Sequence, residues 1–166
     1  SIDTGHQTTL IPRFTQALNF YLEADGRDNN YIGNASAAYP FQIAAPAIAF
    51  TATAVADATA ATWGSGILSV GAYNYDYARY SSTTGEISPA RGTAVSVTTT
   101  AGNQRVTLNA STISTTEQFD KIRIYRTKVS GTQYYEVQDI TPTQFDNGVT
   151  DGFADASLTV VSTIHT

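Results

Sequence analysis

The sequence Gly-Ala-Tyr-Asn-Tyr-Asp-Tyr-Ala-Arg-Tyr, residues 71–80, carries the clearest periodic pattern of the chain. Tyr73, Tyr75 and Tyr77 recur at every second position, with polar residues between them. This period is typical of a β-strand with one buried face, whereas a helix would distribute the three rings around its circumference. We therefore predict a strand whose tyrosine rings enter a core and whose hydroxyls reach the rim of that core.

A second run, Lys-Ile-Arg-Ile-Tyr-Arg at residues 121–126, alternates in the same way. Turn-forming residues divide the rest of the chain, and we predict further strands near residues 47–55, 93–100, 104–110, 133–140 and 158–161. The segments 93–100 and 104–110 are predicted to form a hairpin about residues 101–103. About seven strands at this spacing are typical of an antiparallel β-sandwich.

The composition agrees with an all-β protein and excludes several classes of function. The 166 residues fit one domain with an extension, or two small domains, and strand-favouring Thr, Val, Ile and Tyr are frequent. The net charge of −5 and the scattered basic residues predict no nucleic-acid partner. The chain has no cysteine, so it has neither disulfides nor thiolate metal sites. Its apolar runs are all too short for a membrane span, and we predict no membrane partner.

Residues 1–45 differ from the rest of the chain. The pattern at residues 14–22 fits either a helical face or a strand, and we favour a strand, a turn at Asp25-Gly26 and a second strand. The segment is too short to build its own core, so we predict that residues 1–45 are an N-terminal docking and assembly arm and residues 46–166 a β-sandwich. The predicted partner-binding residues are its large apolar side chains: Phe14, Leu18, Phe20, Tyr21, Tyr31 and Phe41.

Five short stretches carry a resemblance to a known family: residues 71–75, 85–89, 122–127, 134–137 and 144–151. In order and spacing they resemble the fibronectin type III-like modules of tailed-bacteriophage virion proteins. The resemblance covers roughly residues 46–160 and leaves residues 1–45 unmatched. It implies an immunoglobulin-like sandwich in a capsid decoration protein, a collar or head fibre, or a tail component. It implies no catalytic residues, and similar modules also occur in secreted bacterial enzymes and adhesins.

Candidate catalytic and metal-binding residues are few. His6 and His165 lie near the two termini, where we predict that both are solvated, because a Ser-His-Asp arrangement would need one of them fixed by a third group. Aspartates and asparagines near Gly26 and at residues 146–155 supply oxygen ligands, but their spacing does not match a calcium loop. We predict ordinary turn chemistry at both places, with no metal and no cofactor.

Aromatic and basic side chains raise two further hypotheses. Rings exposed together in one groove would favour sugar binding, and the candidates are Trp63, Tyr80, Tyr125 and Tyr134. Arginines on the predicted strands should form surface pairs across the sheet, namely Arg79, Arg123 and Arg126 with Asp76, Glu136 or Asp139.

The sequence thus predicts a non-enzymatic structural protein of a virion, anchored through its arm to a major capsid protein or to a collar or tail protein. We expect a homo-oligomer, with a trimer as one common form of such proteins. The alternative is a glycan-binding or adhesin module that recognises a host surface. An enzyme is third, because these residues do not assemble a nucleophile, a base and an orienting group.

Overall fold

A computed structural model describes residues 43–113 and 118–165, together with the backbone of four short strands between residues 13 and 40. The chain divides into two compact units, Ser1–Ala44 and Ala45–Thr166. We call the second one the sandwich unit. Among the described residues, no helix is long and apolar enough to cross a membrane.

The first unit contains one antiparallel sheet with the strands in chain order: β1 (Arg13–Ala17), β2 (Phe20–Ala24), β3 (Tyr31–Gly33) and β4 (Ala38–Pro40). The ambiguous pattern at residues 14–22 therefore belongs to strands wherever it is described. Of the predicted partner-binding residues, Phe14, Phe20, Tyr21 and Tyr31 lie on these strands. Leu18, Phe41 and the side chains of all six lie outside the described residues, so the docking arm stays a prediction.

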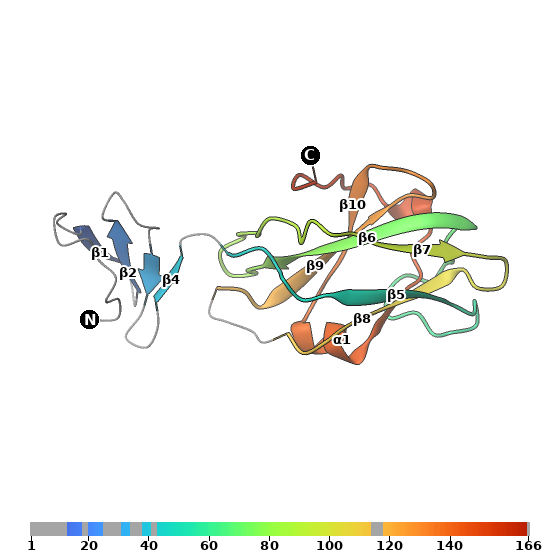
Figure 1. Ribbon diagram of the computed structural model, residues 1–166, viewed down its shortest axis with the longest axis horizontal. Coiled ribbons are helices and arrows are strands. Elements are labelled where there is room, and N and C mark those ends of the chain that lie inside the picture. The colour runs from blue at the N-terminus through green and yellow to red at the C-terminus, as the bar shows by residue number, and fades with distance from the viewer. Residues whose placement is uncertain are drawn as a thin grey trace. The chain divides into compact units, whose positions relative to one another are not determined.

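The sandwich unit is built from two antiparallel sheets, which confirms the predicted all-β sandwich (Figure 1). One sheet has the order β10-β9-β6-β7 and the other has the order β11-β8-β5. Their bounds are β5 (Phe50–Val55), β6 (Gly71–Tyr80), β7 (Val95–Thr99), β8 (Arg105–Ala110), β9 (Lys121–Thr127), β10 (Tyr134–Ile140) and β11 (Val149–Asp151).

The tyrosine-bearing strand β6 lies inside its sheet, between β7 and β9. Tyr73, Tyr75 and Tyr77 are each at most 1% exposed, as their two-residue period predicted. Tyr77 also contacts Phe50 and Phe145 edge-on, with ring centroids 5.6 and 5.3 Å apart, a geometry that aromatic rings favour. The Phe50 and Phe145 rings contact each other in a tilted arrangement at 5.6 Å. The core therefore forms where the two sheets and the helix α1 (Pro142–Asn147) bring large rings together.

The predicted hairpin between residues 93–100 and 104–110 is wrong. β7 pairs with β6 and β8 pairs with β5, so the two strands belong to different sheets. Only an isolated bridge, Thr100 to Asn103, joins them at the turn. The turn carries the chain from one layer to the other with Gly102 at φ 83°, a conformation that glycine adopts without strain.

The predicted strand at residues 158–161 is also wrong, since the last strand is β11 and only Val161 forms an isolated bridge, to Tyr135. Between β10 and β11 the chain forms α1, which the sequence analysis missed. Thr141 caps this helix: its hydroxyl accepts the N–H of Gln144, whose side chain accepts the N–H of Thr141. This capping box with a following proline favours a helix start over a strand.

Candidate functional site

The most polar part of the interior surrounds Arg126 on β9. Its side chain is fully buried and lies between two carboxylates, with Nε 3.1 Å from Asp151 Oδ2 and an Nη1 to Asp155 Oδ1 distance of 2.7 Å. The third guanidinium nitrogen, Nη2, donates to the carbonyl oxygen of Phe153 at 3.0 Å. This corrects the predicted surface pairing of Arg126. The alternation along β9 contained the signal for its burial, because Arg126 lies on the same inward face as Ile122 and Ile124.

Two tyrosine hydroxyls of β6 complete this buried ionic network, which we define as Tyr73, Tyr75, Arg126, Asp151 and Asp155. The Tyr75 hydroxyl donates to Asp151 Oδ2 at 2.8 Å. The Tyr73 hydroxyl lies 3.4 Å from Asp155 Oδ2 and donates to the Ser69 carbonyl at 2.9 Å. The Tyr75 hydroxyl thus binds a carboxylate inside the core, whereas its predicted position was at the rim of the core.

Burial dominates the electrostatics of the network. It raises the pKa of the Asp151 carboxyl above its ordinary value, opposed by the charge of Arg126 and by hydrogen bonds from the Phe153 N–H and Tyr75. Burial next to Asp151 also raises the pKa of Tyr75 well above 10.0, and burial raises the pKa of Tyr73 to about 12. A buried guanidinium without a counter-ion would be very costly, so the network holds β6, β9 and β11 together.

A second polar cluster lies on the other face of the same sheet. His165 Nε2 is 3.2 Å from Asp76 Oδ2 on β6, and His165 Nδ1 is 2.8 Å from Ser162 Oγ. The imidazole stacks on the Tyr134 ring at 4.1 Å and meets the Tyr125 ring at 65° and 4.8 Å. The prediction of a solvated His165 is therefore wrong, while His6 lies outside the described residues.

This cluster contains the side-chain types of a hydrolase triad, namely Ser162, His165 and Asp76. Their arrangement instead suits a structural role, in which they hold the end of the described chain against the sheet. Ser162 and Asp76 are only 4% and 2% exposed, so a substrate has no access to the hydroxyl. The Ser162 Oγ atom also accepts the N–H of Ile164, and Asp76 accepts the N–H groups of Tyr77 and Gly92. These contacts fasten residues 160–165, the C-terminal segment, to the face of β6, β9 and β10.

Arg123 and Arg79 make ion pairs or ring contacts on the same sheet. Arg123 binds Asp139 through two hydrogen bonds of 2.6 and 2.8 Å and lies 3.4 Å from Glu136, as predicted across β9 and β10. The Arg123 guanidinium covers the Tyr80 ring at 4.2 Å, and Arg79 covers the Phe119 ring at 4.9 Å. Both contacts occupy ring faces.

The four aromatic residues considered for sugar binding do not form an exposed groove. Trp63 and Tyr125 are 8% and 1% exposed, and Tyr134 lies under His165. Arg123 covers one face of the Tyr80 ring. The four rings therefore do not provide two exposed faces side by side, as a sugar-binding groove would need. Burial of these rings weakens the glycan-binding alternative.

Three of the four oxygen-bearing candidates between residues 146 and 155 fold inward or accept backbone groups, while the Asn147 side chain is exposed. Both carboxylate oxygens of Asp146 accept the N–H of Ile113, while Asp151 and Asp155 belong to the buried ionic network. Within residues 43–113 and 118–165, no three acidic or histidine side chains gather as a metal site requires.

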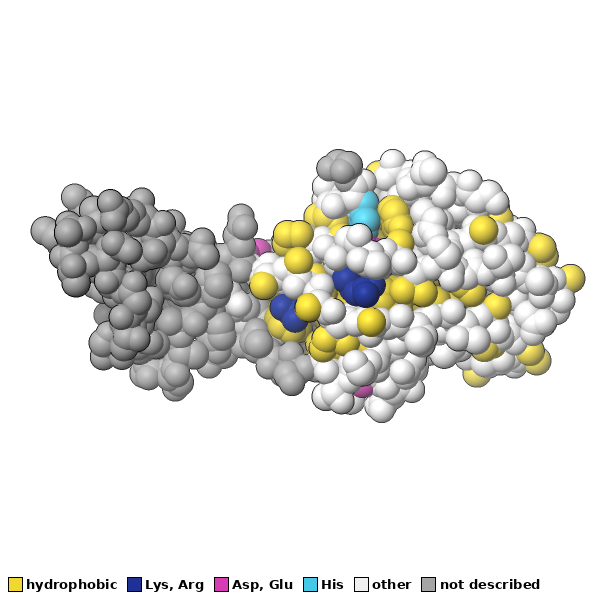
Figure 2. All heavy atoms as spheres, viewed as in Figure 1, with side chains coloured by type: hydrophobic (Ala, Val, Ile, Leu, Met, Phe, Trp, Pro, Cys, Tyr) yellow, Lys and Arg dark blue, Asp and Glu magenta, His cyan; other side chains and the backbone are white. Residues whose placement is uncertain are grey.

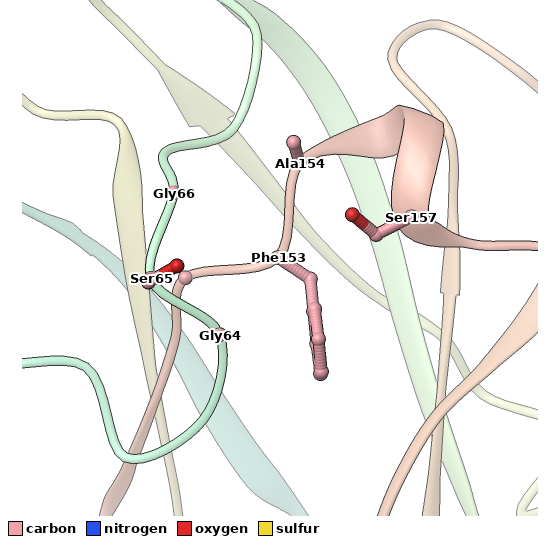
Figure 3. Close-up of a pocket in the computed structure, with 7 residues that line it drawn as sticks. Gly64, Ser65, Gly66, Phe153, Ala154 and Ser157 are labelled. Atoms are coloured by element: carbon pink, nitrogen blue, oxygen red, sulfur yellow. The ribbon is translucent and has the colours of Figure 1, made fainter.

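A pocket lies between two glycine-containing loops of the sandwich unit, residues 64–66 and 152–157 (Figure 3). Its volume is about 340 Å³, and its lining comprises Gly64, Ser65, Gly66, Gly152, Phe153, Ala154 and Ser157. The loops approach so closely that a Cβ atom on Gly64 would lie 2.6 Å from the carbonyl carbon of Gly152. With no charged or basic group in its lining, this pocket offers shape and two hydroxyls but no catalytic chemistry.

A search of known protein families and a search of curated proteins both found no match to the chain.

Proposed function

We propose that this chain is a non-enzymatic structural protein of a tailed-bacteriophage virion. In this proposal it decorates or stabilises the capsid, or forms part of the collar or tail, and is anchored through residues 1–45. Its partners are a major capsid protein or a collar or tail protein, together with further copies of the chain.

The proposal rests mainly on one observation. Stretches that resemble virion modules, residues 71–75, 122–127 and 134–137, fall on β6, β9 and β10, which are neighbours in one sheet. The order β10-β9-β6-β7 corresponds to strands G, F, C and C′ of a variable-type immunoglobulin sandwich. The other sheet departs from that plan, because its outer strand β11 follows β10 in the chain. A fibronectin type III or immunoglobulin-like fold is therefore part of the proposal.

The character of the sandwich unit also supports a structural role. The face of the sandwich unit seen in Figure 2 shows few charged side chains, with scattered hydrophobic ones among the backbone and the other side chains. In the buried ionic network and the C-terminal segment, the charged and polar side chains bind other groups of the same unit and thereby stabilise its fold. Such a unit suits a stable projection from a particle. The glycan-binding or adhesin alternative has less support, because Trp63 and Tyr125 are buried.

In the proposed mechanism, the apolar side chains of residues 1–45 supply the binding energy, since large aromatic residues dominate protein interfaces. The test is co-sedimentation of the purified chain with particles produced by the genome that encodes it. The full chain should sediment with the particles, and a chain lacking residues 1–45 should remain in the supernatant. A double variant, Phe20→Ser with Tyr21→Ser, should lose most of the binding in the full-length protein.

The near-ultraviolet circular dichroism of the buried tyrosines serves as the control for folding of the sandwich unit in each variant. Equal sedimentation of the full and shortened chains, with that spectrum unchanged, would contradict anchoring through residues 1–45.

A further inference from the structure

Two of the four sheet edges in the sandwich unit are closed by the chain itself. Along β10, the C-terminal segment forms two hydrogen bonds, from the Glu136 N–H to the Val160 carbonyl and from the Ser162 N–H to the Tyr134 carbonyl. Along β11, residues 62–66 form a similar cover, with a parallel bridge between Trp63 and Asp151. Backbone groups are therefore occupied along β11 and at Tyr134 and Glu136 in the first half of β10.

The other two edges, formed by β5 and β7, are open. β5 pairs with β8 alone and β7 with β6 alone, and no other described residue pairs with their outer sides. The two strands lie beside each other, one from each sheet (Figure 1). Each presents a row of unpaired backbone N–H and C=O groups, which is a template for pairing with another strand.

The side chains at this open edge lack the usual protection against pairing. Exposed edges in soluble proteins commonly carry lysines, other charges or prolines. Here β5 and β7 themselves contain no charged residue; the nearest charges along the chain are Asp57 and Arg91, and the Arg91 guanidinium lies 5.8 Å from the centroid of the Phe50 ring at the start of β5. Thr51 and Thr53 on the outer face of β5 are exposed.

The inner face of the open edge is apolar and incompletely covered. Ala52 and Ala54 of β5 and Val95 and Val97 of β7 are only half-buried, although they point to the same side as core residues. Small apolar side chains next to unpaired backbone groups would gain burial from an added strand.

We propose that β5 pairs antiparallel with β5 of a second copy, about a two-fold axis, so that the three-stranded sheet continues across two chains. The edge strand is self-complementary: β5 itself carries no charged side chain, so two copies of a protein with net charge −5 pair along it without like charges facing each other. Residues that are directly opposite each other in a sheet point to the same face, so a core-facing residue of one β5 must pair with a core-facing residue of the other. This condition holds only when the two-fold axis passes beside a residue of β5 and not between two residues. A register centred on Ala52 sets Thr51 opposite Thr53 of the second copy, a favourable cross-strand pair.

This interface goes beyond the proposed function, because it uses residues 50–55 of the sandwich unit and not the arm. Its first test compares the mass of the full-length wild type with that of a Thr51→Lys and Thr53→Lys double variant by light scattering over a range of concentrations. The matched control carries the same two charges on exposed positions between β9 and β10, as Thr132→Lys and Gln133→Lys.

Lysines opposite lysines across the axis should weaken association by about tenfold or more, so the edge variant should have a lower mass than the wild type and the control. Far-ultraviolet circular dichroism establishes that the edge variant is folded. Equal masses of wild type and edge variant would overturn the proposal, whether the common species is a monomer or an oligomer assembled through residues 1–45. In the latter case the proposed function would survive.

A second test uses the absence of cysteine in the chain. An equimolar mixture of full-length Thr51→Cys and Thr53→Cys proteins is oxidised mildly and analysed without reductant. Registers centred on residue 51, 52 or 53 each bring one pair of introduced thiols opposite one another, so disulfide-linked dimers should form. A mixture of Thr132→Cys and Gln133→Cys should form far fewer. Equal yields from the two mixtures would show random collision and would overturn pairing through β5.

Discussion

At the scale of single residues, the interior of the sandwich unit depends on an ion pair that water does not reach. Arg126 and Asp151 are both fully buried, and each satisfies the charge of the other. Such pairs add little stability over well-packed apolar residues, but removal of one partner leaves a buried charge without compensation. The two members therefore have to be considered together.

We predict that Arg126→Ala lowers the free energy of unfolding by about 3–5 kcal/mol, because Asp151 then remains buried without its counter-ion. Urea unfolding followed by tyrosine fluorescence measures the loss. The matched control is Arg123→Ala, which removes the partly exposed pairs with Asp139 and Glu136 and the contact with the Tyr80 ring, and should cost about 1–2 kcal/mol. Similar losses in the two variants would contradict the difference in burial that the structure assigns to them.

Tyr73 makes stability depend on pH in the alkaline range. Burial raises its pKa from 10.0 to about 12 in the folded chain. The unfolded chain therefore releases this proton first, and the free energy of unfolding should fall as the pH rises from about 10 to about 12. Below pH 10 both states hold the proton, and this contribution is constant.

Tyr73→Phe removes the titrating hydroxyl, so its loss of stability over this pH range should be smaller than that of the wild type. Chemical unfolding at several pH values from 8 to 12 gives the comparison. Parallel curves for the two proteins would contradict the assignment of this titration to Tyr73.

At the scale of elements, local pattern predicted strands better than it predicted their partners. β6 and β9 were found because aromatic and aliphatic side chains alternate along them. The partner of β7 was missed, because alternation specifies a buried face but not which of two layers receives the strand. The turn at Gly102 suits a hairpin and a crossing between layers equally well.

The same limitation explains what was found and missed in the candidate site. Asp151 and Asp155 were recognised as oxygen donors in turns, but only the tertiary fold brings them to Arg126. His165 was assigned to solvent from its place near the terminus, and its contacts with Asp76 and Tyr134 depend on residues far away in the chain. Long-range neighbours of this kind leave no local pattern in a sequence.

The helix α1 is the element whose sequence marker was overlooked, and its cap can be tested. Thr141→Ala removes the hydroxyl that accepts the Gln144 N–H and should lower the free energy of unfolding by about 0.5–2 kcal/mol. The effect reaches the core because α1 carries the fully buried Phe145. Thr143→Ala, at an exposed position of the same helix, is the control. Thermal unfolding compares the two, and equal midpoints would argue against a functional cap.

At the scale of the whole molecule, the chain combines a small sheet in its first unit with a sandwich whose polar groups serve its own cohesion. Composition and periodicity were sufficient to predict the all-β sandwich. They do not specify how copies or partners meet, because interfaces depend on which edges and faces the fold leaves open. The proposed roles of residues 1–45 and of β5 both belong to this scale.

The most direct measurement is quantitative mass spectrometry of density-purified particles produced by the genome that encodes this chain. A structural virion protein should be present in the particle band at a fixed ratio to the major capsid protein, with peptides from residues 1–45 and from residues 46–166 in equal amounts. Recovery of the chain only in the particle-free fraction of the lysate, with none in the particle band, would contradict the proposed function.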